Sequence, residues 1–161
     1  PEIHGMEEGI RKAGYRFEAA EVPVEGEPIE GIRLKGKIDR IDRNADGGVA
    51  VIDYKTGSAD ISGSEVIKRG ESLQLFIYAM LLKPMGMEAE RVGIYSLKDF
   101  RIKWVPGPRE KRPFSEFIEA ALRYLEETVK QLRRGDFLAA PINEQSCRRC
   151  HERPYCPYIQ K

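Results

Sequence analysis

The chain has 161 residues and a mass of 18.4 kDa, which is the size of a single domain. Hydrophobic residues make up 41%, enough for a core, and charged residues make up 33% with a net charge of +1. No stretch approaches the ~18 apolar residues of a membrane span, and no signal peptide opens the chain. This composition excludes a membrane protein and a disulfide-rich secreted module, and it favours a cytoplasmic location.

The charge is distributed unevenly along the chain. Residues 1–100 hold 14 basic and 18 acidic side chains, a net charge of −4, whereas residues 101–161 hold 13 and 8, a net charge of +5. The last third could therefore face an anion such as nucleic acid, while the first part carries acidic chemistry. Because the first residue is Pro1 and not Met, we expect the chain to be a fragment of a longer protein.

Hydrophobic periodicity and turn residues predict the elements in chain order. They are a helix over 5–14, strands over 15–24, 32–43 and 49–55, a buried helix over 72–82, strands over 91–97 and 102–105, and a long helix from 114 to a stop at 135. Turns are expected at 26–28 and at 44–48. The order predicts an α/β (α+β) fold with a mixed central sheet flanked by helices. Residues 1–138 would form the core and residues 139–161 a tail with all three cysteines.

Two charged residues end the apolar face of the predicted strand over 49–55. Strand alternation puts Asp53 and Lys55 on one face. A hairpin turn centred on residue 46 would place Asp39 opposite Asp53, with Cβ atoms about 5 Å apart. Asp42 would lie on the other face and serve a structural role, for example by pairing with an arginine beside it.

Two opposed carboxylates repel unless a cation lies between them. Mg²⁺ binds one or two carboxylates, often a carbonyl, and several waters, so Asp39, Asp53 and the backbone carbonyl of Tyr54 are candidate ligands. Lys55 would lie within reach of a metal-bound water or a phosphate oxygen, which suits phosphodiester hydrolysis. The alternative is that these residues are solvated edge charges or ion pairs.

A basic loop precedes the long helix. Arg109, Lys111 and Arg112 could contact the phosphate backbone of DNA. The alternative is an ordinary solvated surface.

Four motifs in fixed order resemble one known family. The segments GKIDRID (36–42) and VIDYKTG (51–57), the pair Gln74 and Tyr78 four residues apart, and the tail Cys147-x2-Cys150-x5-Cys156 resemble the PD-(D/E)XK nucleases of the RecB/AddB type. The iron–sulfur nucleases of CRISPR adaptation are close relatives. The resemblance implies a restriction-endonuclease-like core.

The resemblance also implies roles for individual residues. Asp39 and Asp53 would bind Mg²⁺ or Mn²⁺, Lys55 would be the catalytic lysine, and Gln74 and Tyr78 would line the site. The activity implied is a DNA exonuclease acting on single strands or duplex ends in double-strand-break repair. A helicase-nuclease subunit is the partner that the resemblance suggests. The alternatives are a compact CRISPR-adaptation nuclease and a non-catalytic module that binds DNA ends.

Two departures from the family pattern concern metal ligands. The family has an upstream histidine that adds a ligand to the divalent metal, and His4 is the candidate. A 4Fe–4S cluster on Cys147, Cys150 and Cys156 needs a fourth cysteine that this chain lacks, so we expect the cluster only in the full-length protein. A zinc site and three reduced thiols are the alternatives for this tail.

Overall fold

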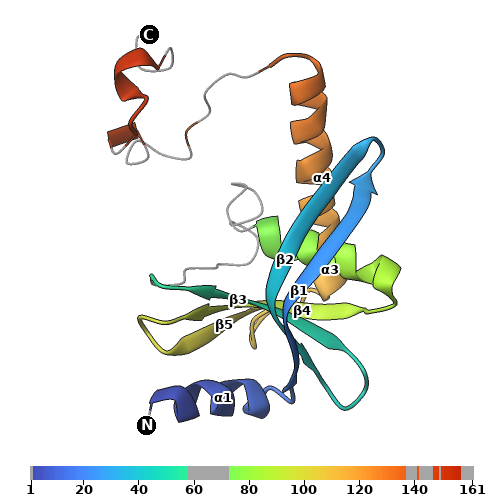
Figure 1. The fold of residues 1–161 in the computed structure, drawn as a ribbon, viewed down its shortest axis with the longest axis vertical. Helices are drawn as coiled ribbons and strands as arrows, with labels where there is room; N and C mark the ends of the chain where they lie inside the picture. Colours follow the sequence, from blue (N-terminus) through green and yellow to red (C-terminus); the bar gives the residue numbers. More distant parts are fainter. Residues whose placement is uncertain (1, 58–72, 137–140, 142–146, 149, 157–161) are drawn as a thin grey trace. The chain divides into compact units, whose positions relative to one another are not determined.

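The computed structural model describes residues 2–57, 73–136, 141, 147–148 and 150–156 (Figure 1). Its elements are α1 (Glu2–Lys12), β1 (Arg16–Ile29), β2 (Ile32–Arg43), β3 (Val49–Lys55), α3 (Leu73–Leu82), η1 (Lys83–Met85), β4 (Ala89–Ser96), β5 (Arg101–Val105), α4 (Phe114–Arg133) and η2 (Arg153–Tyr155). The chain divides into two compact units, Pro1–Tyr124 and Leu125–Lys161. Within the described residues, every helix is too short or too polar to traverse a bilayer. The predicted division at residue 138 stays a prediction.

The five strands form one mixed sheet in the order β1-β2-β3-β4-β5. The β3–β4 pair is parallel and the other three pairs are antiparallel. A parallel pair needs a long crossover, and α3 lies within it. Strand β3 is central, and its residues 49–53 are all buried, as expected for a strand covered on both faces. The predicted α+β fold with a mixed sheet is therefore confirmed.

Helices cover both faces of the sheet in the first unit. Figure 1 shows α1 on one side and α3 on the other. On the α3 side the larger core includes Phe76, which stacks on Phe114 from the start of α4 with ring centroids 6.2 Å apart. On the α1 side a smaller core gathers Ile10, Tyr15, Ala50, Ile52 and Tyr95. The alternate residues of β3 thus belong to two different cores.

The turn predicted at residues 26–28 is wrong. Strand β1 continues to Ile29, and the chain reverses at Gly31, whose φ is +74°. Pro23 does not end β1 because β1 is an edge strand. Gly26 is in the strand for packing: a Cβ there would lie 2.9 Å from Cδ2 of Leu81 on α3.

The other predicted turns and helix ends are confirmed. The β2–β3 turn is closed by the backbone hydrogen bond from Asn44 to Gly48, at 2.9 Å, and Gly47 has a φ of +90°. Gly14 and Gly135 follow α1 and α4 with left-handed φ angles, the usual helix stop. Local turn chemistry was therefore sufficient to place these boundaries.

Candidate functional site

The β2–β3 hairpin has the register that the sequence predicts. Arg40 pairs with Ile52 and Ile41 with Val51. The paired residues of β2 and β3 end there, and Asp39 and Asp53 are the next residue on each strand, opposite each other in the same register. The two carboxylates therefore lie where β2 and β3 begin to separate.

Strand β2 bends at Asp39. Ile38 and Ile41, three residues apart, are both buried in the larger core, so the strict alternation of side chains breaks between them. Glu21 lies opposite Asp39 in the β1–β2 register and has a φ of +55°, a left-handed angle that is uncommon for a glutamate. Beyond this point the long β1–β2 hairpin rises away from the sheet (Figure 1). The bend separates β2 from the end of β3, and Asp39 marks the point where they part.

Asp39 is held by the backbone of β3. Its Oδ2 accepts a hydrogen bond from the backbone N–H of Tyr54, at 3.0 Å. This bond bridges the gap beyond the last paired residues and places the Asp39 carboxylate beside the residue that follows Asp53. Asp39 is thus held by the backbone of the residue that directly follows Asp53, so the two aspartates are neighbours across the strands.

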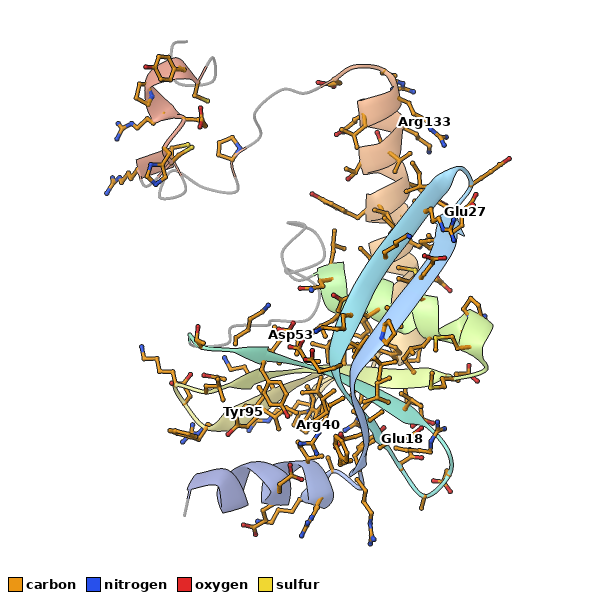
Figure 2. The ribbon with its side chains drawn as sticks, in the orientation of Figure 1. Glu18, Glu27, Arg40, Asp53, Tyr95 and Arg133 are labelled. Atoms are coloured by element: carbon orange, nitrogen blue, oxygen red, sulfur yellow. The ribbon has the colours of Figure 1, made fainter. Side chains whose placement is uncertain are left out.

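Asp53 is a buried carboxylate whose Oδ2 forms an ion pair with Lys55. Its residue is 6% exposed, and Oδ2 accepts no hydrogen bond within the described part of the chain. The Lys55 ammonium lies 2.8 Å from this oxygen as an ion pair without hydrogen-bond geometry, and the Lys55 side chain is 48% exposed. Figure 2 shows Asp53 on the side of the sheet away from α1. Lys55 is therefore paired with a buried carboxylate and is also accessible to solvent.

These residues fit a hard divalent cation. A buried carboxylate is costly unless nearby positive charge compensates it, and oxygen ligands with open positions for water are what Mg²⁺ prefers. Among the described residues, no group of three or more His, Cys, Asp or Glu side chains gathers to bind a metal. The protein would thus supply few side-chain ligands, with water and substrate supplying others. The role predicted for the Tyr54 carbonyl stays a prediction.

Gln74 and Tyr78 share one face of α3, as predicted. Nε2 of Gln74 donates a hydrogen bond to the Tyr78 hydroxyl, at 2.8 Å. The Tyr78 ring lies so close to Gly36 on β2 that a Cβ there would be 2.4 Å from Cε1. Sequence reasoning missed this role of Gly36, although a glycine inside a strand often marks such a close approach. The contact places the Tyr78 ring against β2 at Gly36, which is three residues before Asp39 in the sequence.

A buried ionic cluster lies on the α1 side of β2, where Figure 2 labels Arg40. Nε of Arg40 donates to Asp42 at 2.5 Å, and its Nη1 donates to Glu7 of α1 at 2.5 Å and to the Tyr54 hydroxyl at 3.4 Å. Arg40 and Asp42 are 4% and 0% exposed. The structural role predicted for Asp42 is confirmed, and the same cluster contacts Tyr54, which holds Asp39.

Hydrogen bonds in this cluster shift the pKa values of its members. The bond from Arg40 lowers the pKa of Glu7, outweighing the opposing effect of burial. Burial opposes the charged form of Arg40, but hydrogen bonds to Asp42 and Glu7 raise its pKa above the usual value. Glu7 and Arg40 are therefore both charged at neutral pH, and their ion pair connects α1 to the sheet.

The remaining predicted site residues are not brought to the carboxylates by described contacts. His4 lies in α1, and its side chain is outside the described part. Cys147, Cys150 and Cys156 are free thiols in the second unit, and they form no metal-binding group among the described residues. Their predicted cluster stays a prediction.

One of the three basic residues of the loop before α4 already has intramolecular contacts. Arg112 donates to Glu110 through Nε at 3.0 Å and lies over the Phe117 ring at 4.7 Å. The hydrogen bond from Arg112 lowers the pKa of Glu110 to about 2. Arg109 and Lys111 are exposed. Of the three predicted DNA contacts, Arg112 thus already has an anionic partner.

An open groove of about 960 Å³ in the first unit is lined by residues other than those of this site. Its lining includes apolar side chains such as Met80, Met87 and Ile118. The charged residues of the lining are four carboxylates and one lysine, namely Asp46, Glu88, Glu90, Glu119 and Lys83. A lining in which carboxylates outnumber cations repels phosphate. The groove therefore does not suit a nucleic-acid substrate.

The chain is similar to known nucleases over almost its whole length. The model of a family described as the PD-(D/E)XK nuclease superfamily matches residues 3–157. The crystal structure of SSO0001 has a similar fold, with a TM-score of 0.51 and 21% sequence identity over 97% of this chain and 67% of that chain. No curated protein matches. The family match spans the hairpin, α3 and the cysteine tail.

Proposed function

Because the chain belongs to the PD-(D/E)XK nuclease superfamily, we propose that it is a divalent-metal-dependent DNA exonuclease domain of the RecB/AddB type that acts in DNA repair. The superfamily implies a metal-dependent nuclease with a nucleic-acid substrate. The RecB/AddB type, the exonuclease activity and a cytoplasmic location with a helicase-nuclease partner subunit rest on the resemblance of the motifs.

One observation supports the hydrolytic chemistry above all others. The buried Oδ2 of Asp53 lacks a hydrogen bond among the described residues, and it lies 2.8 Å from the Lys55 ammonium. In the described part of the chain this buried charge is compensated by the half-exposed Lys55 ammonium, so a bound cation would compensate it further. A bound Mg²⁺ or Mn²⁺ would neutralise the scissile phosphate and lower the pKa of an attacking water.

The side chains of the chain itself would divide the remaining work. Asp39 and Asp53 would hold the cation, and the Tyr54 N–H would keep Asp39 in place. Lys55, half-exposed, would donate hydrogen bonds to a phosphate oxygen and stabilise the charge that develops there. The Gln74 amide and the Tyr78 hydroxyl would shape the substrate slot from α3.

The cysteine tail carries a separate proposal. Cys147, Cys150 and Cys156 would bind a 4Fe–4S cluster together with a fourth ligand outside this chain. Iron analysis and the visible absorption spectrum of the full-length protein test this, and a Cys150→Ser variant is expected to lose the absorption. Absence of iron from anaerobically purified full-length protein would contradict it.

The nuclease proposal is tested with the 161-residue chain and end-labelled DNA. Linear single-stranded and duplex substrates are incubated with Mg²⁺, with Mn²⁺ or with EDTA, beside a circular single-stranded substrate. We expect metal-dependent loss of linear DNA, no loss of circular DNA, and no activity in Lys55→Ala. Cutting of the circle would contradict an exonuclease, and binding without cutting in every metal would favour the non-catalytic module.

A further inference from the structure

The strand register extends the site across the sheet to β5. In the parallel ladder Asp53 pairs with Ile94 and Lys55 with Ser96, and in the next ladder Ile94 pairs with Lys103 and Ser96 with Arg101. Residues paired across a sheet share a face. Arg101 and Lys103 therefore stand on the face of Asp53 and Lys55, two strands or about 10 Å away.

Neighbouring residues on these strands confirm this assignment of faces. Val51, Val92, Ile94 and Val105 all belong to the larger core on the α3 side. The residues of opposite parity, such as Ile102 and Trp104, pack against the smaller core on the α1 side. Arg101 and Lys103 are exposed beyond the end of the larger core. This edge of the sheet thus presents two cations beside the candidate site.

The β4–β5 turn next to these cations exposes large apolar side chains. Leu97 is 43% exposed and Phe100 is 44% exposed, with Lys98 between them in the sequence and also exposed. Phe100 has a φ of +50°, a left-handed angle that a bulky residue rarely adopts. Asparagine or glycine would relieve this strain and expose less apolar surface, so folding alone does not explain a phenylalanine here.

Hydrogen bonds join the turn to the end of β3. The backbone N–H of Leu97 donates to the carbonyl of Lys55 at 2.8 Å. The Ser96 hydroxyl lies 2.9 Å from the carbonyl of Gly57 and 3.0 Å from Oδ2 of Asp99, and it accepts from the Asp99 N–H at 3.0 Å. The turn is therefore a fixed structure whose position relative to Lys55 is set by the backbone.

We propose that this surface, formed by Phe100 and Arg101, binds the single-stranded segment of a nucleic acid whose scissile phosphate lies at Asp53. Arg101 would bind a phosphate, and the Phe100 ring would stack on an unpaired base, as in other single-strand binding surfaces. In a duplex the bases are already stacked on each other, so the exposed ring favours a single strand. This inference rests on the proposed function for the position of the scissile phosphate.

The experiment measures binding of the 161-residue chain to a fluorescent single-stranded oligonucleotide and to a blunt duplex, in EDTA so that no cutting occurs. The variants are Phe100→Asn and Arg101→Ala. Lys83→Ala is the matched control, because Lys83 is an exposed cation on η1 outside this surface. Titrations are repeated over a range of salt concentrations.

Each variant has its own expected signature. Phe100→Asn is expected to weaken single-strand binding by at least about fivefold, since stacking on an aromatic ring is worth at least that much per base, and to leave duplex binding as in Lys83→Ala. Arg101→Ala is expected to reduce the slope of log K against log salt by about 0.7, the value for one phosphate contact of a single strand. Single-strand affinities equal to that of Lys83→Ala would overturn the proposal.

Urea unfolding separates a binding role of the ring from a structural one. Asparagine tolerates the left-handed backbone better than phenylalanine, so Phe100→Asn is expected to move the unfolding midpoint to higher urea while it weakens binding. A lower midpoint would show that the ring is structural and would overturn the proposal. Binding that depends on these residues without any metal-dependent cutting would support the single-strand binding surface but refute the proposed nuclease and, with it, the scissile phosphate at Asp53.

Discussion

The substitution Arg40→Met tests how much the buried ionic cluster beside the candidate site stabilises the fold. Arg40 donates to Asp42 at 2.5 and 2.9 Å and to Glu7 at 2.5 and 3.2 Å, and Asp42 is completely buried. Removal of one partner from a buried ion pair costs about 3–5 kcal/mol, because the other charge stays buried without compensation. A domain of this size has a total stability of about 5–15 kcal/mol. We expect the melting temperature to fall by about 6–20 °C, at about 2–4 °C per kcal/mol.

The assay is urea unfolding monitored by circular dichroism. It includes a matched control variant and a double variant. Arg33→Met breaks an ion pair with Glu25 that is largely exposed, so it is expected to leave the stability nearly unchanged. Arg40→Met/Asp42→Leu replaces both buried charges by apolar groups and is expected to recover most of the loss. If Arg40→Met costs no more than Arg33→Met, or if the double variant is as unstable as the single one, the buried pair does not stabilise the fold in this way.

Three further predictions address packing, metal and pH. A Gly36→Ala methyl would lie 2.4 Å from the Tyr78 ring, so the ring must move. We expect this variant to lose about 1–3 kcal/mol of stability and to cut DNA more slowly. The control Gly9→Ala, whose Cβ would lie 3.8 Å from its nearest atom, is expected to keep the stability and the cutting activity unchanged. Mg²⁺ or Mn²⁺ should raise the melting temperature by an amount equivalent to about 2.7 kcal/mol at a hundred times its Kd, EDTA should reverse this, and the same rise in Asp53→Asn would contradict the metal site. The folded pKa of Glu7 lies below its ordinary 4.5, so its ion pair contributes stability above that pH and loses it as the pH falls through the lowered value. The stability difference between the protein and Glu7→Gln should therefore shrink below about pH 4.5 in urea titrations, and a difference that grows would refute the assignment.

Local sequence signals were sufficient for much of the fold. The β2–β3 register followed from the turn at residues 44–48, because a tight turn fixes which residues oppose one another. The hydrophobic stripe and the terminal glycine placed α4. The turn at residues 26–28 was predicted wrongly because Gly26 and Pro28 are acceptable in an edge strand with a close helix beneath it, which depends on the position of the strand in the sheet.

The residues of the candidate chemistry could be found from the sequence, since Asp39, Asp53 and Lys55 follow from strand alternation and a single hairpin. Their surroundings come from long-range packing. The burial of Asp53 beside its ion-pair partner Lys55 depends on α3 and the larger core covering the end of β3. The cations of β5 face the same way as Asp53 because two ladders transmit the register across the sheet: the β3–β4 ladder joins residues 41 apart in the sequence (Asp53 with Ile94), and the β4–β5 ladder is a local hairpin. Contacts between distant segments leave no periodic signal in a sequence, so these features are absent from any local pattern.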